Sequence, residues 1–173
     1  MAMTKKTATP AQKAAATRAK DAIALLKNDH AEVKKLFTAY QKLADKEADG
    51  GQRQPLAEQI CMMLTVHATI EEEIFYPKAR EVLPEGELDL VDEADVEHAS
   101  AKDLIAQIQS MGPNDDLYDA KVKVLGEYID HHVKEEQDEL FPKVKQAGMD
   151  TKAVGEALAA RKEELMSEMG VAA

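Results

Sequence analysis

The stretch HATIEEEIFYP, residues 67–77, places an imidazole four residues before a carboxylate within an otherwise apolar, helix-favouring segment. The stretch HVKEEQDELFP, residues 132–142, repeats the pattern further along the chain. In both stretches a histidine is followed four residues later by a glutamate, Glu71 or Glu136, and an aromatic residue and a proline come at the end. An internal repeat of this kind indicates two similar structural halves.

The spacing of apolar residues predicts four long helices. Large apolar side chains recur every three or four residues, which places them on one helical face. The segments with this spacing are residues 26–44, 60–74, 91–108 and 118–140. Strand-length windows of alternating β-branched residues are missing, so no sheet is expected.

Breaks between these segments divide the chain into helices of similar length. Gly50 and Gly51 are predicted to stop the first helix, and Pro55 suits the first turn of the second. LPEGELD at residues 83–89 and GPND at residues 112–115 separate the later helices. Short breaks between long helices predict an all-α fold, an antiparallel up-down-up-down four-helix bundle.

Two terminal segments are predicted to lie outside this bundle, whose domain we place at residues 21–148. Residues 1–20 are rich in alanine and lysine, and we expect a flexible basic tail that is disordered or extends the first helix. Residues 149–173 are predicted to form an additional C-terminal helix, capped by Thr151. Its apolar stripe must pack on the bundle or on a partner.

Composition narrows the functional classes. The formal net charge of -11 argues against nucleic-acid binding, except through the basic tail. A single cysteine, Cys61, excludes an internal disulfide and a thiolate metal cluster. No apolar run is long enough for a membrane span or a secretory signal, so we expect a cytoplasmic protein without a membrane partner.

A histidine interrupts the inward apolar stripe of every helix, and in the second and fourth helices a glutamate follows it on the same stripe. A lone core histidine is usually a hydrogen-bonded packing residue, but here a duplicated set of histidines and glutamates faces one centre. Because buried carboxylates are rarely tolerated without compensation, the set predicts a bound metal. The candidate metal ligands are His30, His67, Glu71, His98, His132 and Glu136.

The ligand types restrict the metal. Imidazole and carboxylate groups without thiolates suit iron, with manganese or zinc as alternatives, and a helical bundle with paired His-x-x-x-Glu faces suits two ions. If both carboxylates and an oxo or hydroxo group bridge two octahedral ions, about two coordination positions stay open for a small molecule. Dioxygen, peroxide or nitric oxide are then the expected small-molecule partners.

The chain resembles the hemerythrin-like HHE cation-binding family of non-haem di-iron four-helix proteins over residues 22–146. This resemblance implies two iron ions, held by the six candidate ligands. The segments that carry it are NDHAEVKKLF with His30, HATIEEEIFYP with His67 and Glu71, VEHASAKDLI with His98, and HHVKEEQDELFP with His132 and Glu136.

Two features depart from the oxygen-carrying hemerythrins. Those carriers have a second histidine one turn away on the third helix, where this chain has Ala94 and Lys102. They also use a five-residue step from histidine to acid on the fourth helix, which His131 would match. The apolar spacing and the repeat favour His132 instead. His131, Glu72 and Glu135 are then candidates for hydrogen-bonding partners of the ligands, or for solvent-facing groups.

The activity stays open at this stage. The first interpretation is a di-iron protein that binds or senses dioxygen, peroxide or iron. The alternative is a di-iron enzyme that decomposes hydrogen peroxide or nitric oxide, and a metal-free helical interaction module is the third. Tyr40, Tyr76 and Tyr128 are interpreted as core residues, although each has a hydroxyl that could reach an open metal position.

Overall fold

The structure, a computed structural model, describes residues 21–170, and within them every regular element is a helix. The predicted basic tail lies outside the described residues. The long α-helices are α2 (Ala22–Ala44), α3 (Gly50–Ile70), α5 (Asp89–Gln109), α6 (Tyr118–Glu135) and α8 (Thr151–Glu168). The shorter elements are α4 (Tyr76–Val82), α7 (Phe141–Gln146), a 3₁₀ turn at Glu85–Glu87, and π-helical turns at Glu71–Phe75 and Glu136–Leu140.

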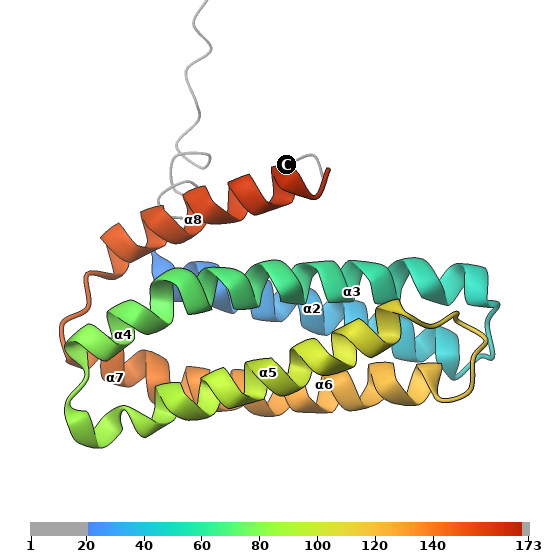
Figure 1. The fold of residues 1–173 in the computed structure, drawn as a ribbon, viewed down its shortest axis with the longest axis horizontal. Helices are drawn as coiled ribbons and strands as arrows, with labels where there is room; N and C mark the ends of the chain where they lie inside the picture. The colour runs from blue at the N-terminus through green and yellow to red at the C-terminus, as the bar shows by residue number, and fades with distance from the viewer. Residues whose placement is uncertain (1–20, 171–173) are drawn as a thin grey trace, which may run out of the picture.

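The helices form the antiparallel four-helix bundle predicted from the sequence (Figure 1). The π turns join α3 to α4 and α6 to α7, so each pair runs on as one long helix. Around the bundle α2 packs against α3, α3 against α5, α5 against α6, and α6 against α2. The additional helix α8 crosses one side of the bundle and contacts α2 and α3.

Two helix starts differ from the sequence prediction. The first helix ends at Ala44, and the two glycines instead begin α3, where Asp49 caps the helix by accepting from the N–H of Gly51 at 3.3 Å. A side chain at Gly50 would clash, because an added Cβ would lie 2.8 Å from Pro113. Because glycine has no side chain, the turn at residues 112–115 can pack closely against the start of α3. Pro55 consequently falls inside α3 and not in its first turn.

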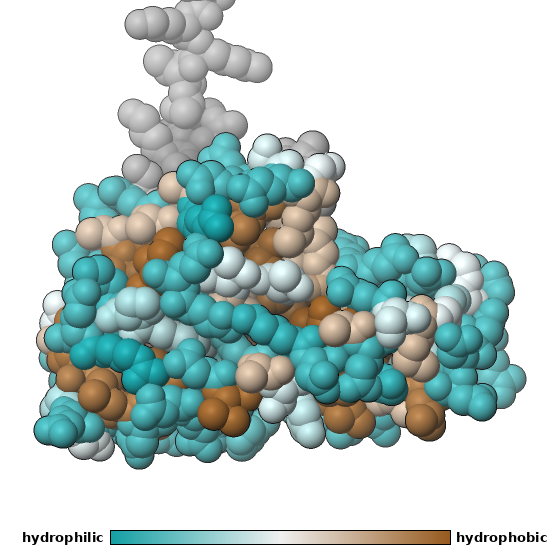
Figure 2. All heavy atoms as spheres, in the orientation of Figure 1, coloured by the Kyte–Doolittle hydropathy of each residue, from teal (hydrophilic) through white to brown (hydrophobic). Residues whose placement is uncertain are grey.

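Asp150, not Thr151, caps α8. Its carboxylate accepts from the N–H of Ala153 at 3.0 Å, and Thr151 is already the first helical residue. The buried side chains Val154 and Leu158 then face the bundle. Figure 2 shows hydrophobic side chains gathered where this helix meets the bundle, beneath a largely hydrophilic outer surface. Among residues 21–170 no helix has the length and apolarity to cross a membrane.

The core is divided into two apolar clusters. One cluster surrounds Phe75, Phe141 and Leu158, and the other surrounds Ile60 and Leu125. Each of the four helical runs of the bundle, α2, α3–α4, α5 and α6–α7, contributes to both clusters and carries a buried histidine near the boundary between them. The apolar clusters therefore close off a polar layer in the middle of the bundle.

Candidate metal centre

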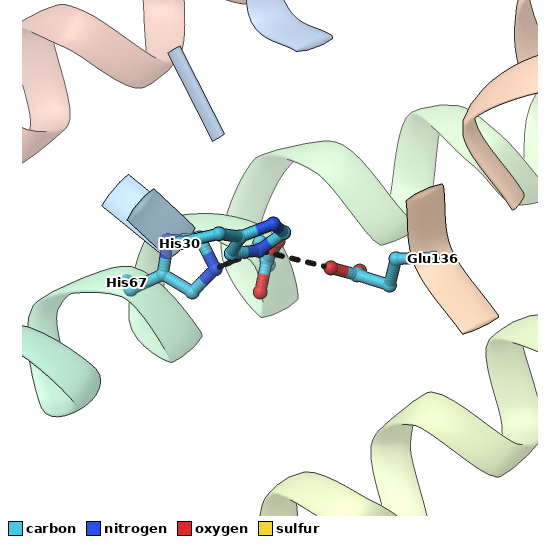
Figure 3. A group of neighbouring side chains, drawn as sticks. His30, His67 and Glu136 are labelled. Atoms are coloured by element: carbon cyan, nitrogen blue, oxygen red, sulfur yellow. Dashed lines mark hydrogen bonds and ion pairs between the residues drawn. The ribbon is translucent and has the colours of Figure 1, made fainter. Parts of the chain in front are cut away.

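Six polar side chains meet in this layer. Each is at most 8% exposed. The rings of His30 and His67 approach one another, and Glu136 reaches the same point from another helix (Figure 3). The contributors are His30 from α2, His67 from α3, Glu71 and Glu136 from the two π turns, His98 from α5 and His132 from α6. The structure thus brings together all six residues that the sequence singled out.

These six residues, the six-donor centre, form two groups that share Glu71. The first group is His30, His67, Glu71 and Glu136, and the second is Glu71, His98 and His132. Glu71 Oε1 lies 3.2 Å from His67 Nε2, and its Oε2 lies 3.4 Å from His98 Nε2. One carboxylate therefore faces both groups, as a bridging ligand would.

Glu136 is placed in a similar way from the opposite side. Its Oε2 lies 3.3 Å from His30 Nε2 and 3.6 Å from His132 Nε2. The histidines are paired across the helices, with 3.0 Å between the Nε2 atoms of His30 and His67. The distance between the Nε2 atoms of His98 and His132 is 3.1 Å.

These spacings suit metal coordination. Bonds of about 2.0–2.2 Å place neighbouring ligand atoms about 2.8–3.1 Å apart on an octahedral ion and about 3.3–3.6 Å apart on a tetrahedral one. The donor atoms of both groups fall within these ranges or close to them. A shared proton between two facing imidazoles can satisfy one such contact, but it cannot satisfy the carboxylates as well.

The carboxylate oxygens supply the clearest sign of a missing partner. Both oxygens of Glu71 and Oε2 of Glu136 are buried and accept no hydrogen bond within the described structure. Buried polar atoms are nearly always hydrogen-bonded, so three such oxygens at one point need another partner. A cation between the imidazoles and these oxygens satisfies all three.

The charges at the centre are strongly coupled. Burial lowers the pKa of His67, but the charge of Glu71 and a hydrogen bond with Asp29 outweigh it and raise the pKa to about 10. Burial also lowers the pKa of His132, yet Glu136 and Glu97 raise it to about 9. Without a metal, protons on these rings compensate the carboxylates. Metal binding therefore displaces protons and weakens as the pH falls.

The second nitrogen of each histidine also has a partner. A carboxylate that accepts from Nδ1–H fixes the ring and leaves Nε2 free to face a metal, as for His67, His98 and His132, whereas Nδ1 of His30 faces an amide nitrogen. The partners of Nδ1 are Gln137 for His30 at 3.0 Å, Asp29 for His67 at 3.4 Å, Glu72 for His98 at 3.0 Å and Glu97 for His132 at 2.7 Å. Of these four, the sequence analysis considered only Glu72.

The four partners of Nδ1 occupy equivalent positions in the two halves of the sequence repeat. Asp29 and Glu97 each directly precede a histidine of the centre, and each contacts the histidine of the next long helix. Glu72 and Gln137 each directly follow a glutamate of the centre. The acidic residue before the histidine in both halves could therefore have predicted, from the sequence, that Asp29 and Glu97 are hydrogen-bonding partners of the histidines. Asp29 is also paired with Lys162 of α8, which links the additional helix to the centre.

Comparison with known protein families agrees with this geometry. The family model of the hemerythrin HHE cation binding domain matches residues 21–144, which is most of the chain. The chain belongs to this family. As a member of the HHE family it has the fold of a cation-binding domain, together with buried histidine and glutamate groups suited to a metal.

Two individual proteins resemble this HHE domain. A DNA nickase from Nostoc sp. (strain PCC 7120 / SAG 25.82 / UTEX 2576) is 31% identical over 122 residues, which are 70% of this chain and 32% of the nickase. The chain thus spans about a third of that relative. The crystal structure of an HHE cation binding domain-containing protein, the Rv2633c homolog from Mycobacterium kansasii, matches with a TM-score of 0.69 at 21% identity. The match covers 86% of this chain and 88% of the Mycobacterium kansasii chain, and it supports the fold.

The π turns shape the HHE domain at the two glutamates. The N–H of Tyr76 donates to the carbonyl of Glu71, and the N–H of Phe141 donates to that of Glu136, so each bond spans five residues. A proline follows each turn, and its missing N–H removes a regular helical bond there. The wider turn adds one residue and brings the fifth residue after each glutamate toward the centre.

The residue that the π turn brings toward the centre is not the same in the two halves of the HHE domain. The hydroxyl of Tyr76 donates to Glu136 Oε1 at 2.9 Å and lies 3.2 Å from His98 Nε2. Phe141, its counterpart in the repeat, stacks on His30 with a ring distance of 6.0 Å. Tyr76 and Tyr40 are buried as predicted, whereas the core prediction for Tyr128 is wrong, because that side chain is half exposed.

A small cavity lies against the six-donor centre. It has a volume of about 30 Å³ and is lined by the four histidines and by apolar side chains that include Val33, Leu64 and Ile105. A cavity needs about 10–15 Å³ on this measure to hold one water molecule. The cavity therefore has room for a molecule as small as dioxygen or hydrogen peroxide.

His131 lies away from the centre. Its ring is 63% exposed and contacts Glu135 at 3.2 Å and Glu97 at 3.5 Å. His132, by contrast, faces the buried donors. Of the further candidates from the sequence, Glu72 contacts a histidine of the centre, whereas His131 contacts Glu97 and Glu135.

Exchanging either adjacent histidine for alanine should separate their roles. We expect His132→Ala to lose metal from the six-donor centre, because it removes a buried donor, whereas His131→Ala should keep the wild-type amount of metal at that centre within error. Metal analysis of both purified variants measures this. If His131→Ala loses metal and His132→Ala keeps it, the assignment of the fourth-helix donor is wrong.

Proposed function

We propose that this chain is a non-haem di-iron protein that binds or senses dioxygen, peroxide or iron at the six-donor centre. The observation that carries the proposal is the pair of buried donor groups joined by Glu71, whose two oxygens accept no hydrogen bond from the described residues. Two cations, one in each group, complete the coordination of these oxygens. A single ion would leave one of the two groups of donors without a metal.

The donor chemistry supports iron. The donors are imidazoles and carboxylates, and the only thiol, Cys61, lies in the apolar cluster around Ile60 and Leu125. Such a ligand set suits iron, with manganese and zinc as alternatives. When bound here, two iron ions would supply electron transfer and Lewis acidity to a small oxidant.

The protein's own groups would hold and orient this chemistry. The carboxylates that accept from Nδ1 keep the imidazole rings in place and make them stronger donors. The apolar clusters on either side exclude water, and the cavity admits only a small molecule. Tyr76 holds a hydroxyl proton at the second group, because burial and the charges of Glu71 and Glu136 raise the pKa of its phenol well above the usual value.

Tyr76 also favours a second candidate, an enzyme that decomposes hydrogen peroxide. Breakdown of peroxide to water and dioxygen requires proton transfer, and the Tyr76 hydroxyl, held against Glu136 and His98, would be placed to take part in it. The same site could act on nitric oxide. Buried carboxylate oxygens that accept no hydrogen bond within residues 21–170 argue against a metal-free helical interaction module.

Metal analysis tests the di-iron proposal directly. Protein produced with added iron should contain two iron ions per chain, one for each buried donor group. Elemental analysis and protein concentration give the ratio, and the optical spectrum of the oxidised protein shows whether the iron is bound. One ion per chain, or none after iron loading, would contradict the proposal.

A further inference from the structure

A cluster of three ionisable side chains lies on the surface beside the six-donor centre. It consists of Glu97 from α5 and His131 and Glu135 from α6, and we call it the surface triad. These helices lie side by side in the bundle (Figure 1). Donor atoms of all three residues lie within 4.8 Å of one another. The triad is therefore built on two packed helices and not on a loop.

The spacing within the triad suits one cation. His131 Nε2 lies 3.2 Å from Glu135 Oε1 and 3.5 Å from Glu97 Oε1. Ligand atoms on a tetrahedral ion with bonds of about 2.0–2.2 Å lie about 3.3–3.6 Å apart. Three protein donors with an exposed fourth position, open to water, form the usual arrangement of an open zinc-type site.

The charges of the triad also favour a bound cation. Other carboxylates near the centre are paired with a cationic side chain, as Glu72 is with Lys102 and Glu73 with Arg161. Within the described residues, the ion pairs of Glu97 and Glu135 involve only histidines. Neither carboxylate has a lysine or arginine partner among the described ion pairs, so a divalent cation bound between them would supply positive charge.

We propose that the surface triad is a third metal site, which takes a divalent transition-metal ion such as Zn²⁺. One imidazole and two carboxylates favour a first-row transition metal over Mg²⁺ or Ca²⁺, which prefer oxygen ligands alone. The site does not depend on which metal occupies the six-donor centre.

The third site is coupled to the centre through Glu97. One oxygen of this carboxylate faces His131, and the other accepts from His132 Nδ1 at 2.7 Å. A cation bound to Glu97 withdraws negative charge from that hydrogen bond and makes His132 a weaker donor. Binding at the surface therefore weakens metal binding at the second group, and by linkage the reverse holds too.

Zinc binding to the iron-loaded full chain tests this site. Equilibrium dialysis against Zn²⁺, with iron and zinc measured in the same sample, should give one bound zinc per chain while the iron is retained. His131→Ala and Glu135→Gln should each weaken this zinc binding by at least about tenfold. Asp130→Asn, which removes an exposed carboxylate paired with Lys34, is the matched control and should bind zinc as the wild type does.

X-ray absorption at the zinc edge identifies the ligands, because iron and zinc are distinguished by element. The wild-type spectrum should show imidazole scattering, and His131→Ala should lose it. Zinc that binds equally well to both triad variants, or that appears only as iron is lost, would overturn the third site. So would a wild-type chain that binds no additional zinc.

Discussion

Replacing Glu71 by alanine is expected to remove both metal ions and to lower the melting temperature of the metal-loaded protein by roughly 10 °C. Glu71 is fully buried and is the one residue common to both donor groups. A ligand held about a thousandfold above its dissociation constant stabilises the native state by about 4 kcal/mol. In a protein of this size each kcal/mol corresponds to about 2–4 °C.

The comparison must separate metal loss from the loss of buried side-chain contacts. Melting curves of the loaded and metal-stripped forms of each protein give the increment due to metal, and that increment should vanish in Glu71→Ala. Glu73→Ala is the matched control, because Glu73 lies two residues away in the same π turn but is exposed and pairs with Arg161. A Glu71→Ala variant with two ions and an unchanged increment would refute its bridging role.

The second large effect concerns reaction with oxidants. We expect the reduced, iron-loaded protein to oxidise in air irreversibly, and the oxidised protein to decompose hydrogen peroxide. The physical reason is the ligand count, which would leave about two coordination positions open on two bound ions, together with a cavity that has room for a small molecule. Stopped-flow spectra measure the first reaction and release of dioxygen the second. A spectrum that returns to the reduced form when oxygen is removed would contradict irreversible oxidation.

Tyr76→Phe tests whether the hydroxyl takes part. Removing a group that transfers protons in the rate-limiting step typically slows a reaction by about a hundredfold or more. We expect Tyr76→Phe to keep its iron and to lose peroxide decomposition by about that factor. Tyr40→Phe is the control, since Tyr40 is also buried but donates to Asp119 in another part of the bundle. Equal rates in the two variants would exclude Tyr76 from the reaction.

The variant Lys102→His tests whether the histidine missing from the third helix is the reason that metal coordination positions would stay open. The sequence suggested position 94 or 102 for an added ligand, and the structure favours 102, because Lys102 lines the cavity while Ala94 is buried in the apolar cluster around Phe75. An added imidazole at 102 should fill one position and slow oxidation in air. If the rate of oxidation in air and the iron content are both unchanged, the missing histidine is not the cause of the irreversible oxidation.

The sequence alone was enough to predict the bundle and the residues that meet in it. Helical periodicity determines which side of a helix faces inward, so a polar residue on an apolar stripe is predicted to be buried whatever the exact packing. The repeat then supplied the second set, and Glu71 and Glu136 lie among the histidines as that reasoning requires. That these residues bind iron stays a prediction.

Only the tertiary structure decided which side chains face one another. Periodicity along one helix says nothing about the neighbouring helix, so the contacts of Asp29 with His67 and of Lys162 with Asp29 could not be derived from spacing. The π turn at Glu71 could not be derived either, because regular helical geometry places Phe75, not Tyr76, beside the glutamate. One extra residue in that turn carries the Tyr76 hydroxyl to the centre, and it does so because tertiary packing and Pro77 outweigh the local preference for a regular helix.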